Sequence, residues 1–138
     1  MLRALILGLT FVFAGFSASA QEQLPPNPAI ETTIQNQFDA FVARDIDRAF
    51  SFASPNIRRL FQNSENFGRM VQSGYPMVWD PGEVDFIDLQ TLGGVIVQLV
   101  EVIDQAGTAH YLGYAMIETE AGWQINGVQV LRAPDVGA

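Results

Sequence analysis

The chain has 138 residues, with 15 acidic residues, 7 Arg, one His and neither Lys nor Cys. One domain is expected, because most domains contain about 100 to 150 residues, and a multidomain enzyme is therefore excluded. A net charge of −8 argues against a protein that wraps nucleic acid or lies on an anionic membrane, since both need a basic surface. Without Cys there are no disulfides and no thiol nucleophile, and a single His argues against a zinc site.

Residues 1–20 have the order of parts that is typical of a secretory signal peptide. Arg3 supplies a positive start, thirteen mainly apolar residues run from Ala4 to Phe16, and residues 18–20 form an A-x-A cleavage site. A retained anchor is the alternative, but a membrane span needs about 20 apolar residues. We expect cleavage before Gln21 and a periplasmic or secreted domain with no membrane span. Its net charge would be −9, because six Arg remain against fifteen acids.

A polar segment and several short helices follow. Residues 21–27 contain two adjacent prolines, which predict an extended linker. Capping residues before Pro, or before apolar residues at helical spacing, predict helices that begin after Asn27, Asp45, Ser54 and either Asn63 or Ser64. The first helix is expected to run to about Arg44. The last is expected to close with Gly74 as its C′ residue.

From residue 75 the apolar period changes from about 3.6 to about 2, which is typical of strands. Strands are expected at 75–79, 84–90, 94–103, 108–119 and 123–131, and the last three should form an antiparallel meander. Helices followed by strands predict a single α+β domain over residues 28–132. Its N-terminal helices would pack on a curved, mainly antiparallel sheet. Residues 133–138 are expected to be a flexible tail.

Residues 49–76 and 114–127 resemble an exported bacterial family catalogued as domain of unknown function 4864. The likeness rests on F-A-S-P-x-I-R at residues 52–58 and on G-Y-P at residues 74–76, and it extends from about Ile30 to Val130. Val128 stands where the family has a Cys, so no thiol role is implied. The family has no established activity. The order of elements also resembles the nuclear-transport-factor-2-like (NTF2-like, cystatin-like) superfamily, which implies only a cone-shaped architecture around a pocket.

Five residues are candidates for contacts in such a pocket. Gln37 lies within the apolar stripe of the first helix, and Arg44 lies near the same stripe. We favour an internal strut between helix and sheet for them, and the alternative is contact with a polar or anionic ligand. Tyr75 and Trp79 lie where helices give way to strands, where they either rim the pocket or fill the core. Tyr114 would be a further polar contact.

His110 is the one side chain whose unperturbed pKa lies near neutrality, so it is the candidate general base. It shares a strand face with Leu112 and Tyr114, whereas Tyr111 lies on the other face. Both faces are apolar, so alternation does not show which of them meets the helices. His110 with Tyr111 or Tyr114 would be an acid/base pair, and the interpretation that we favour is a rim or surface residue. No phosphate-binding or dinucleotide motif is present, so no cofactor is expected.

The acidic residues are concentrated in the strand half. Residues 70–131 contain eight acids and no Arg, whereas residues 21–69 contain six acids and five Arg. This asymmetry predicts a negative sheet face. The face is either a solvated surface that suppresses edge association, which we favour, or a docking surface for a basic protein or a cation.

Together these features predict an exported, non-catalytic binding or accessory module whose pocket takes a small apolar or anionic ligand. One alternative is a small cofactor-free isomerase, lyase or hydrolase that uses the same pocket. The other is a protein-interaction module that uses the acidic sheet face. No nucleic-acid partner is expected, and the sequence identifies no protein partner.

Overall fold

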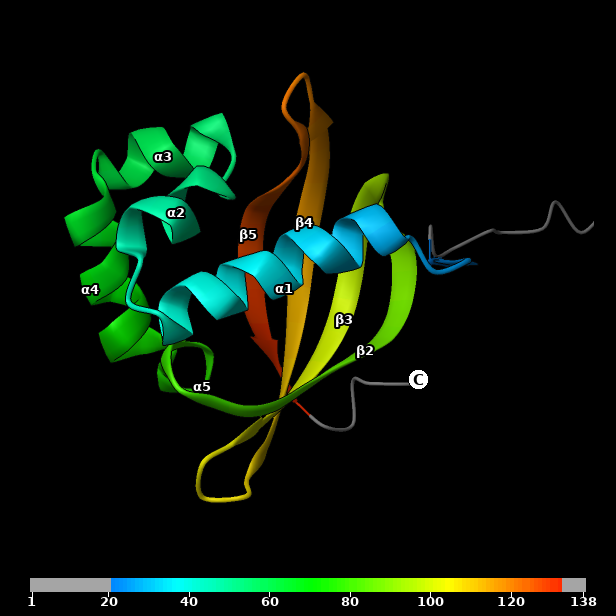
Figure 1. Ribbon diagram of the computed structural model, residues 1–138. Coiled ribbons are helices and arrows are strands. Elements are labelled where there is room, and N and C mark those ends of the chain that lie inside the picture. The colour runs from blue at the N-terminus through cyan, green and yellow to red at the C-terminus, as the bar shows by residue number, and fades with distance from the viewer. Residues whose placement is uncertain (1–20, 133–138) are drawn as a thin grey trace, which may run out of the picture.

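The computed structural model describes residues 21–132, in which helices cover one face of a five-stranded antiparallel sheet (Figure 1). The helices are α1 (Pro28–Val42), α2 (Ile46–Ser51), α3 (Pro55–Phe61), α4 (Ser64–Gly74) and α5 (Pro76–Trp79). The strands are β1 (Glu22–Leu24), β2 (Pro81–Leu92), β3 (Val95–Asp104), β4 (Ala109–Thr119) and β5 (Gly122–Leu131), and they neighbour one another in chain order. The expected α+β class, with helices on a curved antiparallel sheet, is confirmed. The expected signal peptide and tail lie outside the described residues.

The four expected capping sites all begin helices. The side chains of Asn27, Asp45, Ser54 and Asn63 accept hydrogen bonds from backbone N–H groups in the first turn of α1, α2, α3 and α4. Such caps satisfy N–H groups that have no partner within the helix, and each contributes about 1 kcal/mol. Local chemistry therefore explains where these short helices start.

The segment between α4 and the sheet differs from the expectation. Residues 75–79 were predicted as a strand, and that prediction is wrong, because Pro76 begins the single turn of α5. Tyr75 precedes this proline and has an extended φ of −133°, as residues before proline often do. This extended residue does not continue α4, so it separates α4 from α5. Gly74 remains inside α4 and has no left-handed conformation, so its predicted role as a C′ residue is also wrong.

The first helix ends two residues before the expected position. Ala43 is the C-cap and still has right-handed helical angles, and Arg44 then has a φ of 58°, in the left-handed region, which interrupts the helical backbone. Asp45 then caps α2. The sharp turn between the two helices is thus built on a non-glycine residue, which the side-chain contacts described below hold in place.

Part of the expected linker belongs to the sheet. Glu22–Leu24 form β1, which pairs with β2 in the register Glu22–Thr91 to Leu24–Leu89. The half-buried Leu24 packs against the core, and the two prolines follow it. The linker prediction is therefore wrong for residues 22–24, because a short edge strand carries almost no apolar pattern of its own.

Strands β2 to β5 form an open meander joined by hairpins, as Figure 1 shows, and β1 pairs with the edge of β2. Gly93 and Gly94 have φ values of 57° and 83° in the two-residue turn between β2 and β3, where a side chain would be strained. Register shifts after Phe86 in β2 and beside Ala115 in β4 mark bulges, which increase the local bend. The last three strands form the expected antiparallel meander.

The core lies between α1 and the face of the sheet that α1 crosses. Apolar residues of α1 at helical spacing are almost fully buried against alternating residues of β3 and β4, among them Ile34, Phe38, Val100, Leu112 and Tyr114. The two Trp residues and Phe86 are half-buried and pack at the edge of this core. Within residues 21–132, no helix is both long and apolar enough to cross a membrane.

Candidate functional site

An apolar cavity of about 240 Å³ is lined by residues of α1, α3, α4, β4 and β5. Its apolar wall comes mainly from two short helices, with side chains of Ile57, Leu60, Phe61, Phe67, Met70 and Val71. Leu60 is 70% exposed, so the cavity reaches the surface beside α3. None of the described residues that line it is charged.

Three neutral polar side chains complete the lining of the cavity: Gln37 from α1, Tyr75 from the turn after α4, and Tyr114 from β4. The Gln37 amide nitrogen donates to the carbonyl oxygen of Ala49 at 3.1 Å, which ties α1 to α2. The Tyr75 hydroxyl donates to the carbonyl oxygen of Val128 at 3.1 Å. Both groups therefore brace the cavity wall. A carboxamide can make up to four hydrogen bonds, so Gln37 keeps further capacity.

Tyr114 is the most buried polar group of the cavity. Its side chain is 1% exposed, its ring lies 6.1 Å from that of Phe38, and its hydroxyl has no hydrogen-bond partner among the described residues. Burial raises the pKa of this phenol far above its usual range, with a smaller contribution from Tyr75. The hydroxyl is therefore neutral at physiological pH and carries a proton that it can donate.

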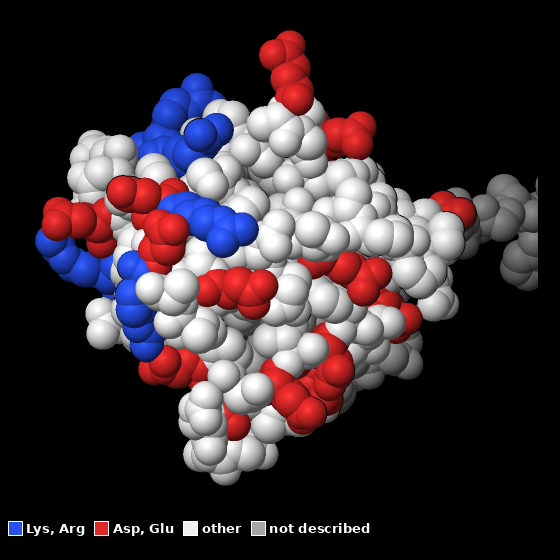
Figure 2. All heavy atoms as spheres, in the orientation of Figure 1, with Lys and Arg blue, Asp and Glu red and all other residues white. Residues whose placement is uncertain are grey.

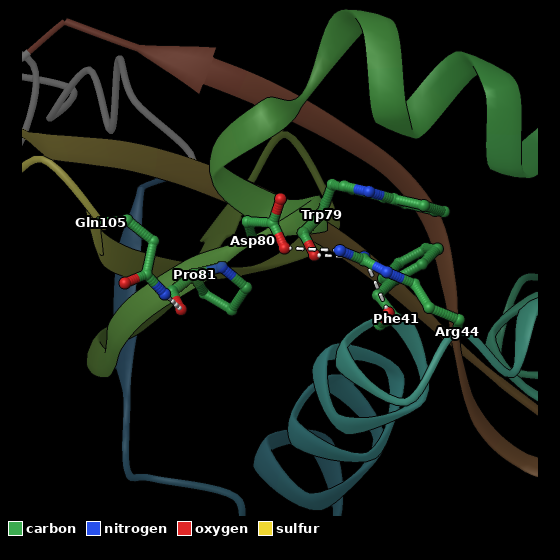
Figure 3. A network of polar contacts seen from close by, with 6 residues as sticks. All are labelled: Phe41, Arg44, Trp79, Asp80, Pro81 and Gln105. Atoms are coloured by element: carbon green, nitrogen blue, oxygen red, sulfur yellow. Dashed lines mark hydrogen bonds and ion pairs between the residues drawn. The ribbon is translucent and has the colours of Figure 1, made fainter.

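Arg44 and Trp79 lie outside the cavity, and Figure 3 shows the contacts that Arg44 makes instead. The Arg44 guanidinium donates to the carbonyl oxygens of Phe41 at 3.0 Å and Trp79 at 2.9 Å, and it pairs with the Asp80 carboxylate at 2.6 Å. It also lies 4.2 Å from the centre of the Trp79 ring. These contacts fasten the end of α1 to the start of β2 and hold the left-handed turn at Arg44.

His110 lies at the far end of β4 from the cavity. Its Nε2 is 2.8 Å from Oδ2 of Asp104, whose other oxygen accepts from the backbone N–H groups of residues 106 and 108 in the hairpin loop. The hydrogen bond to His110 lowers the pKa of the Asp104 carboxyl. His110 shares the inner strand face with Tyr114, but four residues of strand separate them by about 13 Å.

Tyr111 lies on the opposite face of β4, paired across the strands with Glu101. The hydrogen bond to the Glu101 carboxylate raises the pKa of its phenol. The structure thus does not bring His110, Tyr111 and Tyr114 together at one site. No group of three His, Asp or Glu side chains within residues 21–132 is arranged to hold a metal ion.

The two layers differ in their charged residues. Figure 2 shows the Arg side chains gathered over α2, α3 and α4 with acidic side chains among them, while further acidic side chains without Arg extend across the side of the sheet. On β2 and β3, Asp85 and Glu101 are direct cross-strand partners, and Glu83 is exposed beside them. The negative charge of the strand half therefore lies on the sheet surface, away from the cavity.

A family model described as domain of unknown function (DUF4864) matches residues 23–138. The chain belongs to this family. The match begins inside β1, in agreement with the place of this strand in the sheet. Searches of curated proteins and of solved structures found no match to this DUF4864 chain.

The cavity contains Gln37, Tyr75 and Tyr114 of the five expected contacts and leaves out Arg44 and Trp79. Most of its wall in this DUF4864 domain comes from apolar side chains of the predicted short helices, such as Phe67 and Val71, which were not identified from the sequence as pocket contacts. Their helical spacing was a correct signal for burial. An apolar stripe looks the same whether the space that it borders is filled or hollow, so spacing alone did not reveal the cavity.

Proposed function

We propose that this domain is a non-catalytic binding module that holds a small, mainly apolar molecule in the cavity beside α3 and α4. The observation that carries the proposal is the cavity itself, about 240 Å³ in volume and lined by apolar side chains. This lining favours a small apolar molecule, because removing apolar surface from water gains about 25 cal/mol per Å².

The volume limits the size of the ligand. An apolar cavity of about 150 Å³ takes one benzene molecule, so by proportion this cavity suits a compound of about ten non-hydrogen atoms. The exposed Leu60 and the half-buried Met70 would lie at its entrance. Helix α3 has no fully buried residue, which favours small movements that would admit a ligand.

The proposal also includes export of the protein and an NTF2-like architecture. The pattern of residues 1–20 supports secretion to the periplasm or the medium, where the domain would act as an accessory module. The order of helices and then a curved antiparallel sheet supports an NTF2-like architecture. Neither feature identifies a ligand, because function depends on the site and not on the fold.

A binding experiment with two matched variants tests the proposal. Val71 is 4% exposed and lines the cavity, so Val71→Phe fills it, whereas Val42 is 58% exposed on α1 and lies outside it. Ethylbenzene and indole at about 100 times their Kd should stabilise the wild type and Val42→Phe by about 2.7 kcal/mol, a rise in Tm of about 10 °C. Val71→Phe should show no such rise. An absent shift in the wild type, or an equal shift in Val71→Phe, would overturn the proposal.

A further inference from the structure

We propose that the ligand of this cavity is a neutral carbonyl compound whose oxygen accepts a hydrogen bond from the hydroxyl of Tyr114. The inference rests on the proposed binding function and assigns the chemical class of its ligand. Tyr114 becomes the residue that determines specificity, while the apolar side chains of α3 and α4 receive the hydrocarbon part.

The first argument is the unused hydroxyl of Tyr114. The ring is held on β4 between its cross-strand partners Gln98 and Val128, and it packs against Phe38. The residue lines the cavity, and its hydroxyl is buried behind the wall and forms no hydrogen bond among the described residues, so a ligand oxygen would reach it through a small displacement of the wall. Buried tyrosine hydroxyls nearly always have a partner, so a group that lines a cavity without one is suited to a ligand atom.

The second argument concerns the direction of the hydrogen bond. The Tyr114 phenol keeps its proton, because burial raises its pKa. The nearby Tyr75 hydroxyl already donates to the carbonyl oxygen of Val128. The cavity therefore offers a free donor at Tyr114, and an acceptor oxygen on the ligand complements it.

The third argument excludes charge on the ligand. A carboxylate in the cavity would be buried without a counter-ion, because the described lining contains no cationic side chain. Arg44, the one cation that the sequence placed near the pocket, lies outside the lining and pairs with two carbonyl oxygens and Asp80. The ligand is therefore neutral, and the anionic ligand considered from the sequence does not suit this cavity.

The polar groups also fix how the ligand lies. Tyr114 enters from β4 and Gln37 from α1, whereas α3 and α4 contribute only apolar side chains to the wall. A ketone, aldehyde or ester of about ten non-hydrogen atoms would place its oxygen toward the sheet and its ring or alkyl chain toward the entrance beside Leu60.

Three probes of nearly equal size and shape test this inference by calorimetric or NMR titration. Acetophenone carries a carbonyl oxygen, α-methylstyrene replaces that oxygen with a methylene group, and benzoate carries a charge. Tyr114→Phe should weaken acetophenone binding about tenfold and leave the affinity for α-methylstyrene unchanged, since only the first probe loses a hydrogen bond. Benzoate should bind at least about 100-fold more weakly than acetophenone.

The matched control is Tyr111→Phe, which removes a hydroxyl from the same strand but from the opposite face, outside the cavity. It should leave all three affinities unchanged. The inference is overturned if Tyr114→Phe weakens both neutral probes by the same factor, or if benzoate binds as tightly as acetophenone. If neither neutral probe binds the wild type, both this inference and the proposed binding function are refuted. Binding of both with no effect of Tyr114→Phe refutes only the carbonyl assignment.

Discussion

Replacing Tyr114 with Phe should stabilise the ligand-free domain. The substitution removes a hydroxyl that is buried without a partner among the described residues, and it keeps the ring contact with Phe38. An unpaired buried polar group costs about 1 to 3 kcal/mol. The lost oxygen enlarges the cavity by on the order of 10 Å³, which costs about 0.2 kcal/mol. The free energy of unfolding should therefore rise by about 1 kcal/mol, and Tm by about 4 °C.

The assay is urea denaturation followed by the fluorescence of Trp79 and Trp123, which both pack at the edge of the core. The slope of the transition should not change, because the surface exposed on unfolding is nearly the same. Tyr75→Phe is the matched comparison, since its hydroxyl donates to Val128 at 3.1 Å, and it should lower the free energy of unfolding by about 1 kcal/mol. A loss of stability in Tyr114→Phe equal to that in Tyr75→Phe would show that the Tyr114 hydroxyl is satisfied and refute the reasoning.

Three further predictions concern the frame around the cavity. Ser54→Ala should lower the free energy of unfolding by about 1 to 2 kcal/mol in chemical denaturation, because this fully buried serine caps α3 and donates a hydrogen bond to β5. The control is Ser73→Ala at an exposed position, which should change the free energy of unfolding by less than about 0.5 kcal/mol. Asp104→Asn should be less stable than the wild type at pH 7 but equally stable in strong acid. The hydrogen bond to His110 lowers the pKa of Asp104 in the folded state. The ionised carboxylate therefore stabilises the fold at a pH above its unfolded-state pKa of about 3.9, and this stabilisation is lost as the pH falls through the folded-state pKa. A difference that persists at pH 2 in a denaturation series would contradict this assignment. Arg44→Ala should cost about 1 kcal/mol by thermal unfolding and leave the affinity for acetophenone unchanged, since Arg44 acts on the frame and not on the ligand.

Local signals in the sequence predicted most of the helices. Asn27 and Ser54 each precede a proline, and a capping side chain followed by that fixed φ begins a helix with little help from the rest of the fold. The strands after residue 80 were equally clear, because β-branched residues and glycine turns mark both their interiors and their ends. The class of fold followed from the order of these elements.

Elements that depend on distant contacts were not predicted. β1 exists because residues 22–24 find the free edge of β2, some sixty-five residues later in the chain, and three residues carry no pattern of their own. The turn of α5 contains Val78 and Trp79, which favour strands by composition, but Pro76 and packing against α1 impose a helical turn. In both cases tertiary contacts outweigh local preference.

In the candidate site, too, the sequence predicted what depends on local pattern and missed what depends on tertiary contacts. Gln37 was identified as unusual because a polar residue lay in an apolar stripe, and the structure places it at the cavity wall. The partners of Arg44 could not be predicted, because its left-handed backbone directs the side chain toward Asp80, which lies between α5 and β2 and is 36 residues away in the chain. Whether the Tyr114 hydroxyl finds a hydrogen-bond partner among the described residues depends on how the side chains pack, and the spacing of residues in the sequence does not show this.

The central claim is that a small neutral molecule occupies the cavity beside α3 and α4. Isotope-filtered NOE spectra of the protein with acetophenone test it most directly. The account predicts contacts from the methyl group and ring of the probe to the side chains of Met70, Val71 and Tyr114, all of which line the cavity. Contacts confined to exposed apolar residues such as Val42 and Val95, or no contacts at saturating probe, would contradict it.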